Sequence, residues 1–165
     1  MNLKRIFVIG GLLSLVVNCG AFDKPEDQTP LLVAGALLNE NFELNGHWND
    51  GFADHTISAG RNLIDQVWGR WDFTGGGNTT YQSIVEFNNS SKFVYTYTES
   101  CTTAGWCTIG YSRIVWVYSG GSLYTCTEVL PKSTLSQAKA DATHADPNNL
   151  NGGCGGFGWS VMTRK

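Results

Sequence analysis

Strand-like segments separated by turn-forming runs occupy most of the chain, and they restrict its fold more than any other feature of the sequence. The expected strands cover residues 47–48, 52–58, 64–73, 81–87, 92–98, 106–118, 122–129 and 157–163. Glycine, asparagine and serine dominate the separators at 75–78, 88–91 and 119–121. Short strands at regular spacing with such turns are typical of antiparallel sandwiches and barrels. The sequence therefore predicts an all-β, mainly antiparallel meander that forms a small barrel.

Two of the expected strands alternate in a way that assigns their side chains to two faces. In the first, one face carries Tyr81, Ser83, Val85 and Phe87, and the other carries Gln82, Ile84 and Glu86. In the second, Phe93, Tyr95 and Tyr97 oppose Val94, Thr96 and Thr98. The Ser-Gly-Gly-Ser run at 119–122 lies between two later strands and is a strong signal for a tight hairpin.

One short helix is expected near the C-terminus. Thr134 and Gln137 resemble a capping box, in which the two side chains satisfy free backbone amides reciprocally. The residues at 138–142 are mostly good helix formers, and Pro147 stops the helix. A glycine-rich loop at 152–156 then precedes the last strand.

The N-terminal region has the layout of a secretory signal. Lys4 and Arg5 form a short positive region, and the residues at 6–17 are almost entirely apolar. A bilayer span requires roughly 20 apolar residues. A cleaved signal peptide over 1–18 is therefore a better interpretation than a permanent membrane helix.

Cys19 follows the apolar run directly, as the acylated cysteine does in a lipobox. Asn18 stands where a small residue is usual, which resembles the looser lipoboxes of spirochaete lipoproteins. We predict that Cys19 becomes the lipid-bearing N-terminus of an exported protein, anchored to the bacterial outer membrane or cell surface. An ordinary signal peptide followed by an incidental cysteine is the alternative. A lipidated N-terminus and tether then cover 19–40, and one β-domain covers 41–165.

The chain has five cysteines, and four remain without Cys19: Cys101, Cys107, Cys126 and Cys154. An even set in an exported chain predicts a disulfide framework. Of the three possible pairings we favour Cys101–Cys107, which closes a tight loop, with Cys126–Cys154, which spans the helix and ties the last segment to the domain. A zinc site is the alternative, but the sequence lacks a C-x-x-C motif.

The charge balance excludes one class of partner. The chain carries 14 acidic and 11 basic residues, and two of the basic residues lie in the signal. The exported part is therefore acidic, which argues against nucleic-acid binding through phosphate contacts. It argues equally against docking of the folded domain on anionic lipid. The lipid on Cys19 is then the expected membrane contact, and no cofactor is predicted.

Gly46-His47-Trp48 opens the first expected strand and resembles the Gly-x-Trp motif of the lipocalin and calycin barrels. The resemblance implies a calycin-like barrel in which Trp48 plugs one end beneath a basic residue, a role open to Arg164. The Thr-Asp-Tyr motif of lipocalins is absent, and the chain is short for that family. A core tryptophan in another β-fold is the alternative.

The mature region also resembles a group of small spirochaetal surface lipoproteins of unassigned function. The resemblance lies in the segments 46–48, 114–116, 122–126 and 152–159. It implies that Cys126 pairs with Cys154, and it implies no activity.

Aromatic residues are the most suggestive candidates for binding. The chain has six tryptophans and six tyrosines, and such side chains often contact ligands or partners. The candidates for lining a barrel mouth or a sheet face are Trp68, Trp71, Tyr95, Tyr97, Trp106, Trp116 and Tyr118. Core packing is the alternative role for the same residues.

A weaker candidate is a group of possible metal ligands formed by His47, Asp50, Asp54 and His55. A metal ion needs such ligands to converge, as they would if the two histidines faced each other across a hairpin. Aspartate and histidine that serve only surface solubility are the alternative.

Three functions of different classes are compatible with these observations. We favour a non-enzymatic binding module, displayed on the membrane by Cys19, for a small apolar ligand or for a host or envelope protein. The alternatives are a structural envelope protein without a ligand and a metal-dependent hydrolase that uses His47 and His55. The sequence contains no Ser/His/Asp order in a nucleophile-elbow context, so no catalytic residue is predicted.

Overall fold

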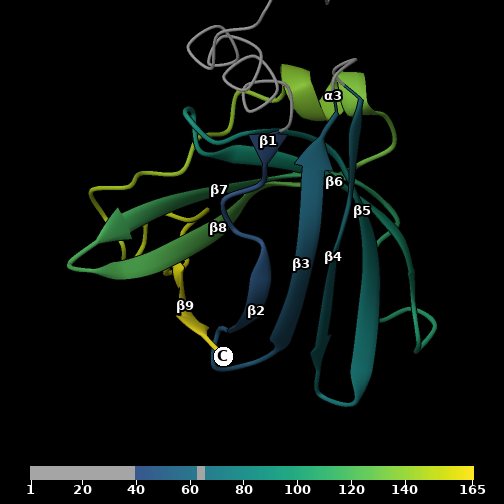
Figure 1. The fold of residues 1–165 in the computed structure, drawn as a ribbon, viewed down its shortest axis with the longest axis horizontal. Helices are drawn as coiled ribbons and strands as arrows, with labels where there is room; N and C mark the ends of the chain where they lie inside the picture. The colour runs from purple at the N-terminus through teal and green to yellow at the C-terminus, as the bar shows by residue number, and fades with distance from the viewer. Residues whose placement is uncertain (1–39, 63–65) are drawn as a thin grey trace, which may run out of the picture. The chain divides into compact units, whose positions relative to one another are not determined.

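The computed structural model describes residues 40–62 and 66–165, and it is mostly β-structure (Figure 1). The strands are β1 (Glu40–Asn41), β2 (Gly46–Asn49), β3 (Asp54–Arg61), β4 (Val67–Gly75), β5 (Asn78–Asn88), β6 (Phe93–Cys101), β7 (Gly110–Ser119), β8 (Ser122–Lys132) and β9 (Ser160–Arg164). The predicted signal peptide (1–18), Cys19 and the tether up to residue 39 lie outside the described residues.

The strands β2 to β9 form a closed antiparallel barrel of eight strands. Successive strands from β2 to β8 pair as hairpins, and β9 closes the ring because it pairs with both β8 and β2. The short β1 pairs with the end of β3. The predicted all-β antiparallel barrel with one short helix near the C-terminus is confirmed.

Two hairpins owe their tight turns to paired glycines. Gly120 and Gly121, between β7 and β8, have φ angles of 58° and 81°. Gly76 and Gly77, between β4 and β5, have φ angles of 58° and 78°. Positive φ at both central residues is the requirement of the two-residue turn whose twist matches that of the flanking strands. The predicted hairpin at 119–122 is confirmed.

The assignment of side chains to the two faces of a strand is right for β6 and wrong for part of β5. Along β6, Val94, Thr96 and Thr98 are all buried, as the alternation required. Along β5, however, Gln82 and Ile84 are buried together with Phe87, which was expected on the opposite face. A register shift between Ile84 and Glu86 causes this change of face, because a β-bulge adds one residue to the strand.

The apolar core fills one part of the barrel and is built around a segment between β1 and β2. Phe42 and Leu44 from this segment are essentially inaccessible to solvent. The Phe42 ring lies 5.0 Å from that of Phe87 and 5.2 Å from that of Trp116, measured between centroids. Trp48, Ile57, Ile84 and Met162 belong to the same cluster.

The helix α3 (Leu135–Ala140) packs against β7 and β8. Its predicted capping box is present, since Thr134 Oγ1 accepts a hydrogen bond from Gln137 N and the Gln137 side chain accepts one from Thr134 N. Ala138 is completely buried in a second apolar cluster with Tyr95 and Val129. The helix therefore covers part of the sheet that the main core does not occupy.

Both favoured disulfides are confirmed. Cys101–Cys107 closes the loop between β6 and β7, and for this reason β7 begins at Gly110 rather than at the expected residue 106. Cys126–Cys154 joins β8 to the long segment that precedes β9. The strands of the described residues and both disulfides lie within one compact unit, Asn39–Lys165.

Candidate functional site

A cavity of about 630 Å³ lies inside the barrel, beside the apolar core. The segments that surround it are the β2–β3 turn, the loop between β6 and β7, and the segment before β9. The turns that join β2 to β3 and β4 to β5 lie together at the bottom of Figure 1. A cavity of this size accommodates a drug-sized small molecule.

One wall of the cavity consists of small, uncharged polar side chains from β5 to β8. Its members are Thr80, Gln82, Thr98, Ser112 and Thr125, all of them buried. These residues point into the barrel, as the core residues Phe87, Val94 and Trp116 do in the apolar part of the interior. The inward positions thus change from large apolar residues to small polar ones, which leaves space within the barrel and gives it a hydroxyl-bearing wall.

A second wall of the cavity is aromatic. It comes from β3 and β4, where His55, Trp71 and Phe73 line the cavity. Trp71 Nε1 donates a hydrogen bond of 3.0 Å to His55 Nδ1. His55 Nδ1 is therefore unprotonated, and the proton of the neutral ring resides on Nε2. The His55 ring lies 5.6 Å from that of Phe73, so the three rings form one aromatic wall.

The environment of His55 favours the neutral imidazole. Burial lowers the pKa of His55 below its ordinary 6.5, and the nearby carboxylates of Asp50 and Asp54, which raise it, do not overcome this effect. Burial acts in the opposite sense on Asp50 and raises its pKa. Hydrogen bonds from the backbone N–H groups of Ala53 and Phe52, together with His55, outweigh that effect, so that the pKa of Asp50 is lowered. The cavity wall thus combines a neutral imidazole with an ionised carboxylate.

Exposed aromatic side chains surround the entrance. Phe52 is 88% exposed, Trp106 is 62% exposed and Phe157 is 78% exposed, and all three line the cavity. Trp106 stands in the loop closed by Cys101–Cys107, and Phe157 follows Cys154 in the segment that the second disulfide attaches to β8. The two disulfides thus restrain the segments that carry two of the three rim aromatics.

The cavity carries little charge. Among the described residues that line it, Asp50 and His55 are the titratable ones apart from disulfide-bonded cysteines, and none is lysine or arginine. Asp50 Oδ2 lies 3.3 Å from His55 Nε2, and this contact contributes to the lowered pKa of Asp50. One buried polar atom of a lining residue, Gln82 Oε1, has no hydrogen-bond partner in the described part of the chain. Buried polar atoms of this kind usually have partners.

The aromatic residues that we expected to form one binding surface are distributed over several places. Trp71 and Trp106 line the cavity, whereas Trp116 is buried in the core and its Nε1 donates to Glu43. Tyr95 lies in the cluster beneath α3, and the Tyr97 ring lies 4.7 Å from that of Tyr111, measured between centroids, with the two rings tilted by 43°. The remaining two, Trp68 and Tyr118, are each 53% exposed.

Trp48 and Arg164 are neighbours, as the calycin resemblance implied for a tryptophan and a basic residue. They are paired across β2 and β9, and the Arg164 guanidinium carbon lies 5.4 Å from the Trp48 ring centroid. Trp48 Nε1 donates a 2.8 Å hydrogen bond to the carbonyl oxygen of Leu44. This pair connects the last strand to the apolar core.

The two candidate metal-ligating histidines lie on opposite faces of the β2–β3 hairpin. His47 is paired with Thr56 and exposed, while His55 is paired with the buried Trp48. Asp54 lies on the outer face and forms an ion pair with Lys165 at 2.6 Å. No group of three or more His, Cys, Asp or Glu able to hold a metal ion occurs in residues 40–62 and 66–165. The structure therefore does not bring His47, Asp54 and His55 together.

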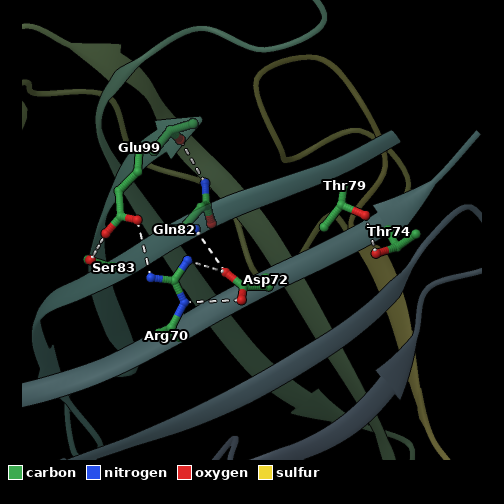
Figure 2. A network of polar contacts seen from close by, with 8 residues as sticks. Arg70, Asp72, Thr74, Thr79, Gln82, Ser83 and Glu99 are labelled. Carbon is green, nitrogen blue, oxygen red and sulfur yellow. Dashed lines mark hydrogen bonds and ion pairs between the residues drawn. The ribbon is translucent and has the colours of Figure 1, made fainter. Parts of the chain in front are cut away.

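A charged network links β4, β5 and β6 near the cavity wall (Figure 2). Arg70 contacts both carboxylate oxygens of Asp72 at 3.0 and 3.1 Å and binds Glu99 at 3.1 Å. Its hydrogen bonds to Asp72, and then to Glu99, raise the pKa of Arg70. Asp72 also accepts a 3.0 Å hydrogen bond from Gln82 N, which fixes the backbone that carries the Gln82 side chain into the cavity.

A buried ion pair outside the cavity was not evident from the sequence. Arg113 and Glu128 pair on neighbouring strands, with side chains 10% and 6% exposed. Arg113 Nη2 donates a 2.5 Å hydrogen bond to the carbonyl oxygen of Thr143, and Glu128 Oε2 accepts one of 2.7 Å from Ala145 N. The pair thus attaches the segment that follows α3 to the barrel. Sequence spacing gave no signal for it, because the two residues belong to different strands.

Comparisons with known proteins supply no further assignment. No protein family model matches the chain, and no curated protein or solved structure matches it. Within the described residues, no helix has the length and apolar character needed to cross a membrane.

Proposed function

We propose that this protein is a binding module that takes a small uncharged molecule into the barrel cavity and is displayed on a membrane by a lipid on Cys19. The observation that carries the proposal is the cavity of about 630 Å³, with its hydroxyl-bearing wall, its aromatic wall and its exposed aromatic rim. A pocket with mostly apolar surface and a few convergent polar groups is the usual form of a small-molecule site.

The charge of the lining selects against anions. Transfer of a carboxylate or phosphate from water into a buried site is strongly unfavourable unless a cation pairs with it. No lysine or arginine is found among the described lining residues, and Asp50 adds a negative charge. An uncharged ligand avoids this unfavourable transfer.

A cationic ligand is also disfavoured, because Asp50 is already engaged. Its Oδ1 accepts hydrogen bonds from Phe52 N at 2.8 Å and Ala53 N at 2.7 Å. These bonds hold the carboxylate in the β2–β3 turn, beside His55. The ligand is thus expected to meet the neutral hydroxyl, amide and aromatic groups of the walls.

Two fluorescent probes that differ by one charge test this proposal. Phenylnaphthylamine is neutral, and anilinonaphthalene sulfonate carries the same ring system with a sulfonate. The unit Asn39–Lys165 is expected to bind the neutral probe at least tenfold more tightly at pH 7, in a fluorescence titration. Absence of binding by the neutral probe, or equal affinity for the two probes, would contradict the proposal.

A matched pair of variants locates the bound probe. Ser112→Leu places a larger apolar side chain in the cavity, whereas Ser58→Leu makes the same change at an exposed position of β3. Ser112→Leu should weaken binding of phenylnaphthylamine at least tenfold, and Ser58→Leu should leave it unchanged. If both variants bind as the unmodified unit does, the probe occupies another place.

A further inference from the structure

Exposed apolar side chains gather at the entrance of the cavity. The rim aromatics Phe52, Trp106 and Phe157 extend from three different segments, and Ile109, in the same loop as Trp106, is exposed as well. We propose that the three rim aromatics enter the interface of a membrane made of neutral lipid. The inference rests on the anchor at Cys19 that the proposed function includes, and it does not depend on what the cavity binds.

The segments at this end of the barrel contain no charged side chain. They are the residues 51–53, 75–78, 102–109 and 154–158, and none of them is lysine, arginine, aspartate or glutamate. In an ordinary chain about a quarter of the residues are charged. Because the transfer of a charge out of water is strongly unfavourable, a surface without charges enters an apolar medium far more readily than an ordinary protein surface.

The charged residues that flank the β2–β3 turn are already engaged. The Asp50 side chain is only 14% exposed, and its carboxylate accepts hydrogen bonds from Phe52 N and Ala53 N within the turn. Asp54, on the other side of the turn, forms an ion pair with Lys165 at 2.6 Å. Phe52 therefore projects between two carboxylates that have partners within the protein.

The exposure of the rim aromatics favours lipid over a protein partner. Phe52 and Phe157 are almost fully exposed and Trp106 is mostly exposed, so each ring projects from its own segment instead of joining a flat apolar face. A protein partner would need a matching hollow for each ring, whereas lipid adapts to projecting side chains. Aromatic residues, tryptophan above all, are also the residues that proteins place at the boundary between membrane and water.

The chain that leads to the predicted anchor is long enough for the rim to meet the same membrane. β1 pairs with the end of β3 that is distant from the rim, and Figure 1 shows β1 and the β2–β3 turn at opposite ends. The eight residues of β3 account for a separation of about 26 Å. About 20 residues lie between Cys19 and Asn39, and a chain of that length spans up to about 70 Å. An acyl group on Cys19 and the rim can therefore reach one bilayer together.

The rim orients the anchored domain and does not replace the anchor. Stable anchoring requires two or more buried acyl chains, so the contact of three side chains is readily reversible without the lipid on Cys19. The whole chain carries more acidic than basic residues, and an anionic membrane surface repels such a domain. The lipid expected at the rim is thus neutral overall, as phosphatidylcholine is.

A quencher carried by the lipid tests the proposal. The full acylated chain is reconstituted into vesicles of phosphatidylcholine with brominated acyl chains, and its tryptophan emission is compared with that in unbrominated vesicles. Bromine quenches a tryptophan only where the ring reaches the acyl region. Of the six tryptophans, Trp68 and Trp106 are the exposed ones, and we expect the quenched emission to come from Trp106.

A matched pair of variants assigns the quenching. Trp106→Phe keeps the rim apolar and should lower the bromine-dependent loss of emission at least threefold. Trp68→Phe makes the same change at the end of β4 that pairs with Gly60, away from the rim, and should leave that loss unchanged.

A second set of variants tests whether the other rim aromatics are required. Phe52→Ser combined with Phe157→Ser should lower the quenching of Trp106 at least threefold, and both side chains are so exposed that the fold should tolerate the change. Tyr118→Ser removes an exposed aromatic residue near the other end of β7 and should not affect the quenching. Replacement of about a third of the lipid by anionic phosphatidylglycerol should reduce the quenching in the unmodified chain.

The outcomes separate this inference from the proposed function. A chain that floats with the vesicles but is not quenched, or is quenched equally in Trp106→Phe, overturns the rim contact and leaves the anchor and the cavity untouched. Emission of Trp106 that changes with protein density on the vesicles, without quenching by bromine, indicates a contact with a second copy and also overturns it. A chain that does not float with the vesicles contradicts the anchor, and with it both the proposed function and this inference.

Discussion

At the scale of single residues, His55 shows how neighbouring side chains set the chemistry of the cavity. The hydrogen bond from Trp71 determines which ring nitrogen carries the proton, and burial favours the neutral ring. Protonation of Nδ1 would place two N–H groups against each other where one hydrogen bond now exists. The same side chain thus lines the cavity and is expected to make the stability of the barrel sensitive to pH.

The free energy of unfolding should fall as the pH decreases below about 6.5. The folded-state pKa of His55 lies below its ordinary value of 6.5, so the unfolded chain takes up this proton first and acid favours unfolding. The stabilisation that results from the lowered pKa of His55 is complete above pH 6.5. It is lost as the pH falls towards the pKa of His55 in the folded state. Urea titrations at several pH values measure it.

His55→Gln is the control for this prediction, because glutamine can accept the Trp71 hydrogen bond and does not titrate. The difference in stability between the two proteins should change with pH only below about 6.5. Parallel pH profiles would show that His55 does not titrate as described.

At the scale of elements, the segment after α3 is held by the buried pair of Arg113 and Glu128. Arg113 reaches the carbonyl oxygen of Thr143, and Glu128 accepts from the backbone of Ala145. Both side chains are nearly inaccessible. The pair therefore positions a segment that lacks a strand or helix of its own.

Removal of one member of this pair should be strongly destabilising. Glu128→Leu leaves the Arg113 charge buried without its carboxylate, which should lower the free energy of unfolding by about 3–5 kcal/mol. Arg113→Met should have a similar effect. The double variant should lose clearly less than the sum of the two, because it contains no uncompensated charge. Denaturant unfolding provides the three values, and strict additivity would contradict the coupling.

The strands themselves were predictable to different degrees. The hairpin at 119–122 and the capping box at Thr134 follow from local chemistry and were expected. The change of face along β5 was not, because the bulge beside Glu86 depends on how β5 pairs with β6. The start of β7 was misplaced because the loop closed by Cys101–Cys107 replaces its expected first residues.

At the scale of the whole molecule, the spacing of strand-like segments and turns predicted the barrel, and the cysteine count led to its disulfides. The cavity could not be predicted in this way. In the sequence, nothing distinguishes Gln82, Thr98, Ser112 and Thr125 from other polar residues, and only closure of the barrel brings them together. Trp71 was identified as a candidate, but its partner His55 had been considered only as a metal ligand. Local patterns thus predicted the scaffold, and three-dimensional closure created the site.

The two disulfides should contribute unequally to stability. A disulfide lowers the entropy of the unfolded chain by closing a loop. This effect predicts about 3.6 kcal/mol for Cys126–Cys154, whose members are 28 residues apart, against about 2.2 kcal/mol for Cys101–Cys107, with a separation of 6. Paired Cys→Ser variants, one pair at a time, measure both contributions in denaturant. The reverse order would mean that the short loop stabilises the barrel by another route.

The lipid anchor is a separate prediction at this scale. Cys19→Ala removes the site of acylation, so the protein should move from the membrane fraction to the soluble fraction, since stable anchoring requires two or more buried acyl chains. The double variant Cys101→Ser with Cys107→Ser is the control, because it removes cysteines but retains Cys19. It should leave the protein in the membrane fraction. Retention of the Cys19→Ala protein in membranes would refute the anchor.

The central claim is that the interior of the barrel is the binding site, and backbone amide NMR during a titration with phenylnaphthylamine tests it most directly. We predict that the largest shifts occur at Gln82, Thr98, Ser112 and Thr125, which form the polar wall. Shifts confined to the outer hollow near Lys92 and Trp159, or no shifts at saturating probe, would contradict it.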